Sequence, residues 1–586
     1  MSIIKNIKLS LLALAAVTVL MYGTTLFNGF VWDDFNLILE DPIIQKTDIT
    51  QAFSLDHWKN IPAAERARFR PVRVVSFIVD HLIYGNAPFG YHLTNLLLHM
   101  GNVLLVYLVA LVLFKDATAA FIAGLLFSIH PVHGESVSWV KNRSDLLCSL
   151  FMLSSLLALL RLAGVRRMIV VTVLFVAAVL SKEIGFMAPL LALGVVLIYG
   201  EKQQRTKDLI WLGICNAVVA GFFIAKQVLW KNEMVLQTGL VVDAYIQMRI
   251  VLYTLSTYAN MLLFPANLNP EHYFNMYITI PQAISVGFVV FAVIGVLLYA
   301  GYKLYKQGIL PEKYHALMQH TGFGYMLMVL TIVPVSNIVF LESRPIAEQR
   351  LYIPSIGFVF MVGVLLSAFL RKAANEKALI PIQMGSVYRW GYNSMYGMLV
   401  VAVLALGTYT VQRNFIWKDE FSFWKETVRL SPTHYRANFN LGIMYLKQEN
   451  IEKAAQYFAV ASMDCDDPEV FYNLACCYDA LGKYGEALMN YDKVIVSLPN
   501  VHPDVYNNIG VVHEKAGNAK KAREYYEKAL AMDASNKPAR FNLAQLYEKQ
   551  GKIKRARQEY TDFMRVTRNT YDRQEAKDKL QELVKR

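Results

Sequence analysis

The sequence predicts an all-α protein in two parts, a polytopic bundle of membrane helices followed by an α-solenoid of helical repeats. Up to residue 412 the chain is a series of apolar runs, each near the roughly 20 residues that a membrane-spanning helix needs. From residue 413 to 586 it is polar, charged and rich in helix-forming residues. One pattern recurs there about every 34 residues. The ranges 1–412 and 413–586 are the two predicted domains.

Composition supports this division. The 586 residues are 55% hydrophobic and only 18% charged, so the chain is too apolar for a soluble protein and too long for one domain. The net charge of +13 fits basic loops on the cytoplasmic side of a membrane. Nucleic-acid binding is the rival explanation of the charge, but no basic–aromatic cluster or known binding motif accompanies it. We therefore expect no nucleic-acid partner and a lipid bilayer as the environment.

Eleven apolar runs are predicted to cross the membrane. They lie near residues 8–27, 92–114, 118–130, 145–163, 167–181, 184–200, 209–230, 282–302, 322–340, 352–370 and 391–411. The first run follows Lys5 and Lys8 as in a signal peptide, but it lacks a well-placed small-residue cleavage site and is expected to stay as a span. Lys and Arg collect in alternate loops, which assigns these loops to the cytoplasm. The segments assigned to the outer side are 28–90, 131–144, 231–281 and 341–351.

One further apolar run, residues 246–264, remains. A full crossing there would invert the orientation of every later loop. The run is therefore expected to re-enter the membrane or to lie along the interface, since partial crossings are tolerated where they line a protein cavity. An odd number of spans then places the C-terminal repeats on the outer side.

The C-terminal part contains four units in register. Their shared feature is an asparagine followed by an aliphatic and a small residue, at Asn440, Asn473, Asn508 and Asn542. Glycine marks the turn in the last three units, whereas the first unit has Glu449 there. The pattern resembles the tetratricopeptide repeat, a helix–turn–helix unit that stacks into a concave surface for a protein or peptide. A plain spacer is the alternative reading.

The predicted outer segments hold most of the polar residues that could carry chemistry. Asp33 and Asp34 are adjacent carboxylates at a membrane boundary, where a charge near hydrocarbon costs about 2.5–3.5 kcal/mol. Solvated loop acids are the alternative. The other candidates are cationic, acidic, imidazole or phenolic side chains in or beside the outer segments: Arg70, Arg73, His130, His133, Glu135, Arg143, Lys182, Glu183, Arg344, Glu348, Arg350 and Tyr352.

Several of these candidates have a structural alternative. His130, His133 and Glu135 could ligate a metal, but they lack a fixed helical spacing, and helix capping or hydrogen bonding explains them as well. Lys182 and Glu183 could form a simple interfacial ion pair.

Arg350 is harder to explain structurally. It lies in a short basic and acidic cluster between two spans, and the planar fork of a guanidinium matches phosphate oxygens. The cluster therefore suits phosphate capture.

Eight short motifs follow one another along the first domain. They are Trp32–Asp34, Arg70–Arg73, Phe89–His99, His130–Glu135, Asn142–Asp145, Leu180–Glu183, Pro334–Asn337 and Glu348–Ser355. Each is moderately specific, but their order resembles the membrane glycosyltransferases of the GT-C fold. More narrowly, the chain is similar over nearly its whole length to the transmembrane and tetratricopeptide-repeat O-mannosyltransferases and their bacterial relatives. The resemblance includes the link into the repeats, from Arg413 and Asn414 through Trp417 and Trp424 to Pro432. It departs from the animal members in having few repeats, so their acceptor preference does not carry over.

The resemblance implies transfer of a sugar from a polyprenyl-phosphate donor to an acceptor hydroxyl, expected on Ser or Thr of a protein bound in the repeat groove. Asp33 or Asp34 would act as general base, and one displacement would invert the anomeric carbon. Fixed cations would stabilise the leaving phosphate. The candidate cations are, in order of preference, Arg350 and Lys182, then Arg70, Arg73, Arg143 and Arg344. Supporting roles fall to His130, His133, Glu135, Glu183, Glu348 and Tyr352.

Three questions stay open from the sequence. Some GT-C enzymes hold a divalent ion on such acids and others use none, so Mg²⁺ or Mn²⁺ on Asp33 and Asp34 is one alternative. The function could instead be that of a non-enzymatic membrane scaffold or transporter, or of a glycosyltransferase acting on a lipid or glycan. The family resemblance favours a bacterial inner membrane with periplasmic repeats over an endoplasmic reticulum membrane with lumenal repeats.

Overall fold

The computed structural model describes residues 4–585 apart from 5, 55–68, 230–242, 273–278, 339–343, 380–384, 464, 499 and 568. All regular secondary structure in these residues is helical, as predicted. The chain forms two compact units, Met1–Glu426 and Thr427–Arg586. The predicted boundary after residue 412 lies earlier, near the end of α21 (Gly385–Asn414). The difference arises because Trp417 and Phe423 pack on rings of the first unit.

The first unit is a helix bundle. Its α-helices besides α21 are α2 (Ile7–Tyr22), α3 (Pro42–Gln45), α4 (Ile49–Phe53), α7 (Pro71–Tyr84), α8 (Pro88–Phe114), α9 (Ala117–Ile129), α10 (Gly134–Ser138), α11 (Arg143–Arg161), α12 (Gly164–Ser181), α13 (Ala188–Tyr199), α14 (Lys202–Leu229), α16 (Ala244–Leu263), α17 (Ile280–Ala283), α18 (Val286–Lys306), α19 (His315–Ile332) and α20 (Pro354–Leu379). Helix α22 (Glu420–Leu430) crosses into the second unit.

Most of the predicted spans are helices of the required length. In the described part of the chain, eight helices are long and apolar enough to cross a membrane, and a bent pair, Ala117–Ile129 with Pro131–Ser138, counts as a ninth. The predicted span at 184–200 is a shorter apolar helix, Glu183–Tyr199. The predicted span at 209–230 falls in α14, where the side chains of residues 222–230 lie outside the described residues. The first unit is thus built as a membrane protein.

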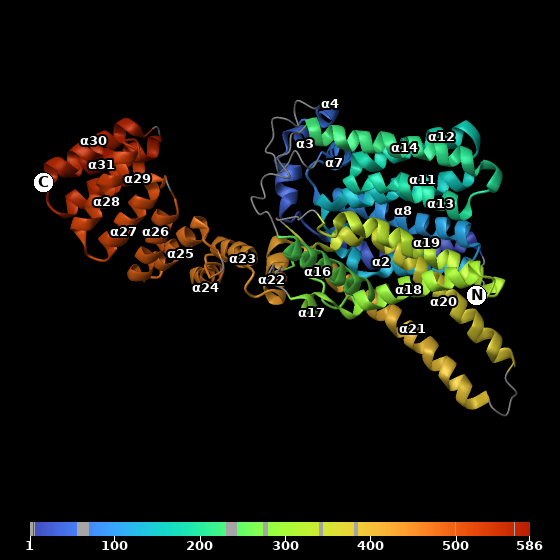
Figure 1. The fold of residues 1–586 in the computed structure, drawn as a ribbon. Helices are drawn as coiled ribbons and strands as arrows, with labels where there is room; N and C mark the ends of the chain where they lie inside the picture. Colours follow the sequence, from blue (N-terminus) through green and yellow to red (C-terminus); the bar gives the residue numbers. More distant parts are fainter. Residues whose placement is uncertain are drawn as a thin grey trace. The chain divides into compact units, whose positions relative to one another are not determined.

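The predicted re-entrant run is α16. It is one uninterrupted helix of 20 residues, and it is not among the helices apolar enough to cross a membrane. Because it does not turn back on itself, its continuity favours the interfacial alternative. Figure 1 shows α16 and α17 at the same end of the bundle as α3, α4 and α7.

The bend after α9 has a local cause. Pro131 has no N–H to donate to the preceding turn, and its ring disfavours the helical conformation of the residue before it. His130 is accordingly extended, with φ −74° and ψ 123°, and the two helices meet at 50°. The break brings residues 130–138 to the end of the bundle where the polar residues collect.

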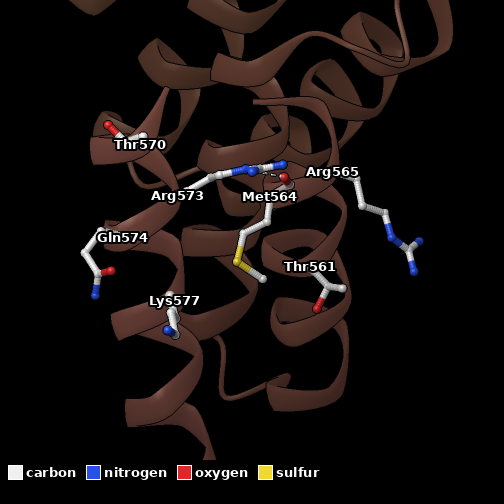
Figure 2. A pocket seen from close by; sticks show the side chains of 7 residues that line it. All are labelled: Thr561, Met564, Arg565, Thr570, Arg573, Gln574 and Lys577. Carbon is white, nitrogen blue, oxygen red and sulfur yellow. Dashed lines mark hydrogen bonds between the residues drawn. The ribbon is translucent and has the colours of Figure 1, made fainter. Parts of the chain in front are cut away.

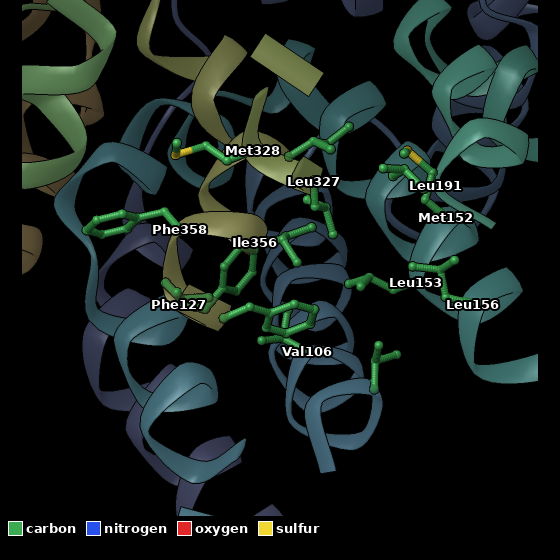
Figure 3. Packing of buried hydrophobic residues seen from close by; sticks show 14 of the residues in the cluster. Val106, Phe127, Met152, Leu153, Leu156, Leu191, Leu327, Met328, Ile356 and Phe358 are labelled. Carbon is green, nitrogen blue, oxygen red and sulfur yellow. The ribbon is translucent and has the colours of Figure 1, made fainter. Parts of the chain in front are cut away.

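The core of the first unit is formed by apolar side chains from several helices. Figure 3 shows Val106, Phe127, Leu153 and Ile356 packed together, contributed by α8, α9, α11 and α20. Helices α19 and α20 approach each other closely because glycines face one another. A Cβ at Gly357 would meet backbone atoms of α19, and one at Gly324 would meet backbone atoms of α20. Small residues of this kind are typical of helix interfaces in membranes.

The second unit is the predicted repeat array. Its helices are α23 (Tyr435–Lys447), α24 (Ile451–Ala461), α25 (Pro468–Ala480), α26 (Tyr484–Ser497), α27 (Pro503–Lys515), α28 (Ala519–Met532), α29 (Lys537–Lys549), α30 (Ile553–Val566) and α31 (Thr570–Lys585). Gly442 and Gly510 lie against the rings of Phe458 and Tyr526. The small residue of each unit therefore lets its two helices approach, as the sequence predicts.

The turn of the first repeat is strained. Gly482, Gly517 and Gly551 have φ between +69° and +79°, and Glu449 takes the same left-handed conformation at φ +59°. A residue with a Cβ pays roughly 1–2 kcal/mol for this conformation. Glu449→Gly should therefore raise the free energy of local unfolding in α23 and α24 by about 1 kcal/mol, measured by hydrogen exchange on the full chain. Gly482→Glu should lower the same quantity in α25 and α26, and equal stabilities for both variants and wild type would contradict the prediction.

Candidate functional site

The site begins at the turn that follows η1 (Gly23–Phe27). Trp32 has φ +54°, a conformation that costs about 1–3 kcal/mol and that clusters at functional sites. The turn places the Trp32 ring parallel to Trp139, with ring centroids 5.2 Å apart. We call these two rings the tryptophan platform. Asp33 follows directly, its side chain 26% exposed, and its Oδ2 accepts from the Lys141 ammonium.

Asp34 has a different environment from its neighbour. It is 1% exposed, and both of its carboxylate oxygens accept backbone N–H groups, from Val31 at 3.1 Å and from Lys141 at 2.8 Å. Burial raises the pKa of Asp34 to about 7, against the lowering effect of these two bonds and of the Lys141 charge. Asp34 thus joins the turn that carries Asp33 to the turn that carries Lys141.

The raised pKa of Asp34 predicts a pH-dependent stability. The folded protein binds the Asp34 proton more tightly than the unfolded chain does, because the pKa of an aspartate side chain is ordinarily 3.8. The resulting stabilisation is complete below about pH 4 and is lost as the pH rises through about 7. The thermal unfolding midpoint of the purified protein should therefore fall between pH 5 and pH 8, and Asp34→Asn should reduce that slope. An unchanged slope in the variant would show that another group titrates.

Two cations lie over the tryptophan platform. The Lys141 Nζ is 4.5 Å from the centre of the Trp139 ring, and the Arg344 Cζ is 5.6 Å from the centres of both platform rings. Cation–π contacts of this kind hold a charge at a fixed place. Arg344 also pairs with the buried Glu135 at 2.9 Å. The platform therefore gathers Asp33, Lys141 and Arg344 from three segments that are distant in the sequence.

Arg350 lies on the same segment as Arg344. Its guanidinium donates to the backbone carbonyls of Pro345 and Arg344, both at 2.5 Å. Within the described residues it forms no ion pair, and it is only partly buried. The charge of Arg350 is therefore oriented by the backbone and is not neutralised by a described carboxylate.

Arg70 and Lys182 form a second polar cluster. Arg70 pairs with Glu183 at 2.9 Å and donates to Ser144 at 3.3 Å, whereas Lys182 pairs with Asp145 at 2.6 Å. The two cations are 17% and 12% exposed. Arg70 and Lys182 therefore tie residues 182–183 to residues 144–145.

Arg143 and Arg73 are buried more deeply. The Arg143 side chain is 0% exposed, pairs with Asp80 at 2.6 Å and donates to Asn95 at 2.8 Å. Arg73 is 3% exposed and lies over the ring of Phe77. A guanidinium enclosed in this way favours a structural role, whereas the sequence places both arginines among the candidate phosphate ligands.

The two histidines hold the broken span in shape. His130 Nδ1 accepts from the Val132 N–H and its Nε2 bonds the carbonyl of Leu262. His133 bonds the carbonyl of Phe127 and the hydroxyl of Ser355, each at 2.8 Å. Since both nitrogens of each ring are occupied, their geometry favours the capping and hydrogen-bonding alternative over a metal.

The remaining predicted residues are buried. Tyr352 bonds His99 at 2.7 Å through its hydroxyl. Glu135 and Glu348 are both 0% exposed, and Glu348 pairs with Arg413 at 2.6 Å. Lys141 and Arg413 are not among the predicted site residues, although Lys141 lies in a predicted outer segment and the family resemblance includes Arg413. Their pairing with Asp33 and Glu348 is a tertiary contact that the sequence pattern does not indicate.

A divalent ion on the two aspartates does not fit this arrangement. Both oxygens of Asp34 are taken by backbone N–H groups, and Asp33 is paired with Lys141. Across the residues that the structure describes, no group of three or more His, Cys, Asp or Glu could hold a metal ion. No catalytic step is therefore assigned to a metal.

The repeat unit has a cavity of about 460 Å³ beside α30 and α31. Figure 2 shows its lining, in which Met564 lies centrally and Arg573 donates to the Met564 carbonyl at 3.2 Å. The residues that line it are Thr561, Met564, Arg565, Thr570, Arg573, Gln574 and Lys577. This lining contains three cations and no carboxylate.

Comparisons with known proteins agree with both units. Models described as tetratricopeptide repeats match residues 423–468, 472–537 and 514–569. The mouse protein named Protein O-mannosyl-transferase TMTC3 is 26% identical over 95% of this chain, and the human protein of the same name is 25% identical over 97%. The chain spans 64% and 65% of the length of these two relatives. A crystal structure of MamA, 19% identical, matches 27% of this chain and 92% of its own chain with a TM-score of 0.24.

The order of motifs, the helical membrane unit and these similarities lead to one conclusion. The chain is similar over nearly its whole length to proteins named as protein O-mannosyl-transferases, and its C-terminal unit matches tetratricopeptide repeats.

Proposed function

We propose that this protein is a glycosyltransferase that moves a sugar from a polyprenyl-phosphate donor to a Ser or Thr hydroxyl of a protein. The observation that carries the proposal is the position of Asp33, a partly exposed carboxylate beside two cations on the tryptophan platform. The names of the relatives support a sugar transferred to protein. The repeats, which form concave surfaces in such arrays, would bind the acceptor.

Asp33 is the general base in this proposal. It would take the proton of the acceptor hydroxyl while that oxygen forms a bond to the anomeric carbon, and the bond from this carbon to the phosphate oxygen breaks. The bonding electrons leave with the lipid phosphate, and a single displacement inverts the configuration. Lys141 pairs with Asp33 and holds its carboxylate in place, and a carboxylate also favours the oxocarbenium character of the sugar. Both oxygens of Asp34 accept backbone N–H groups and the residue is buried, which supports the choice of Asp33 over Asp34.

Arg350 and Arg344 are the cations we assign to the leaving phosphate. Arg350 forms no ion pair with a described residue. Arg344 pairs with Glu135, but its guanidinium lies over both rings of the platform that also holds Asp33. Donors aimed at charge that develops in the transition state contribute most when they are fixed beforehand. Lys182 and Arg70 pair with Asp145 and Glu183 in the second cluster and not over the platform, and we assign them to shaping the approach to the site.

The polyprenyl chain would reach the site from within the bilayer. Residues of the predicted outer segments contact one another around Asp33 and Glu348, so the reaction would take place at the outer face. With the charge pattern of the loops, this supports a multi-pass membrane protein with the repeats on the outer side. The bacterial inner membrane with periplasmic repeats is the location that the family resemblance favours.

The test uses the full chain in lipid nanodiscs. Undecaprenyl-phosphate [³H]mannose is added with a Ser/Thr peptide or with the same peptide carrying Ala at every Ser and Thr. Label on the first peptide only supports the proposal. Label in the lipid fraction alone would favour the alternative of a lipid or glycan acceptor. Absence of transfer with mannose, glucose and N-acetylglucosamine donors would favour a membrane scaffold or transporter.

A further inference from the structure

We infer that Arg413 and Asn414, the last two residues of α21, are positioning residues of the catalytic site, because they join the segment of the general base to the segment of the phosphate-binding arginines. The inference rests on the proposed function. It gives a role to two residues that are not among the predicted site residues, although the family resemblance extends through them, and it makes the chain that leads into the repeats a part of the site.

Asn414 ties the segment before Asp33 to the segment before Lys141. It is 0% exposed. Its amide donates to the Met21 carbonyl at 2.7 Å, its Oδ1 accepts from the Ser138 hydroxyl at 3.1 Å, and its own carbonyl accepts from the Asn28 amide at 3.3 Å. Met21 and Asn28 precede the turn at Trp32, and Ser138 precedes Trp139. One buried residue therefore holds the two segments that carry the tryptophan platform at a fixed distance from each other.

Arg413 ties α21 to the arginine segment. Its guanidinium pairs with Glu348 at 2.6 Å and donates to the Leu268 carbonyl at 2.9 Å, and its side chain is 1% exposed. Glu348 is two residues before Arg350 in the short helix η8 (Glu348–Leu351). A buried pair of this kind holds its partner in one geometry, since either charge left alone would be costly.

The residues that follow continue the contact. The rings of Trp417 and Trp139 stack at 5.3 Å, and Trp424 meets Trp32 edge-on at 5.3 Å. The Gly29 N–H donates to the Lys418 carbonyl at 2.8 Å. The segment 413–424, which belongs to the first compact unit, thus packs against both rings of the tryptophan platform.

These contacts predict an effect on reaction geometry in addition to stability. Asn414 and Arg413 touch no described member of the pair Asp33–Lys141 directly, so they act through the segments they join. A displacement of about 1 Å in a catalytic group costs on the order of 100-fold in rate. Loss of the Asn414 bonds should therefore lower kcat without weakening peptide binding.

The experiment compares Asn414→Leu with Asn438→Leu in the full chain. Asn438 is the matched control, because it is buried and its amide also donates to backbone carbonyls, of Pro432 and His434, but within the repeat unit. We measure kcat and peptide KM for sugar transfer. Mass spectrometry also follows the rate at which sulfosuccinimidyl acetate modifies Lys141, a readout that needs no turnover.

Asn414→Leu should lower kcat about 10- to 100-fold, leave peptide KM within about 2-fold, and raise Lys141 modification several-fold. Asn438→Leu lies in the repeats that would bind the acceptor, so it is compared on kcat and Lys141 modification alone, and it should change neither at an equal loss in unfolding midpoint. Equal effects of the two variants, or unchanged Lys141 reactivity in Asn414→Leu, would overturn the inference. If Asn414→Leu does not fold, Arg413→Lys, which keeps the charge beside Glu348 but loses the fork, should give an intermediate fall in kcat, and wild-type kcat in that variant would be equally decisive.

The failure of the proposed function has a different signature. Wild-type protein would then transfer no sugar, while Lys141 would still become more reactive in Asn414→Leu and not in Asn438→Leu. In that case Asn414 would still be shown to hold the two segments together, but it would have no role in catalysis.

Discussion

Asp33→Asn should lower kcat for sugar transfer by about 10²- to 10⁴-fold, the usual contribution of a positioned general base. Asparagine keeps the size of the side chain and can still accept from Lys141, but it cannot take a proton from the acceptor. Because Asp33 is partly exposed and its pair with Lys141 lies at the surface of the site, the unfolding midpoint should change little. The measurement is transfer of labelled mannose to the Ser/Thr peptide in nanodiscs, at saturating donor and peptide.

Asp34→Asn is the matched control for this prediction. In the wild type, each carboxylate oxygen of Asp34 accepts a backbone N–H. In the variant, the NH₂ group of the asparagine replaces one of these oxygens, and the buried N–H left without an acceptor costs about 1–3 kcal/mol. The variant should lose stability, and its folded fraction should keep more activity than Asp33→Asn. If Asp34→Asn abolishes transfer at unchanged stability while Asp33→Asn remains active, the assignment of the base is wrong.

Arg143→Met should lower the free energy of unfolding by about 3–5 kcal/mol, because it leaves the carboxylate of Asp80 buried without its cation. Both side chains are almost fully enclosed, at 0% and 3% exposure. Chemical denaturation in detergent, followed by circular dichroism, measures this loss.

Two further results separate this structural role from donor binding. Arg143→Met with Asp80→Leu removes both charges and should recover a large part of the lost stability. If Arg143 bound the donor phosphate instead, the single variant would raise the donor KM at unchanged stability, and the double variant would restore nothing.

The repeats were predictable because their pattern is local. Each unit repeats the same asparagine, aliphatic and small residues, and the glycine at each turn reflects a left-handed backbone that the structure shows at Gly482, Gly517 and Gly551. Even the departure at Glu449 adopts that conformation. The unit is thus repeated in backbone geometry as well as in sequence. Apolar length likewise indicated most of the membrane helices.

The candidate site was predictable only in part. The polar residues of the outer segments do meet at one end of the bundle, as the contacts Asp33–Lys141 and Arg344–Glu135 show. The sequence could not show which of these residues are available to bind a substrate. A buried arginine such as Arg143 cannot be distinguished in the sequence from a partly exposed one such as Arg350. The separate environments of Asp33 and Asp34 were equally hidden, since they depend on which backbone N–H groups come near.

By itself, the sequence determined a helical membrane unit, a tetratricopeptide array and the list of polar residues from which a site could be built. These follow from hydrophobic length and from periodicity, which are properties of neighbouring residues. The tertiary structure decided which carboxylate stays accessible, which cations are already paired, and that Arg413 and Asn414 join the site. Burial and ion pairing depend on residues hundreds of positions apart, and only the folded chain brings them within hydrogen-bonding distance.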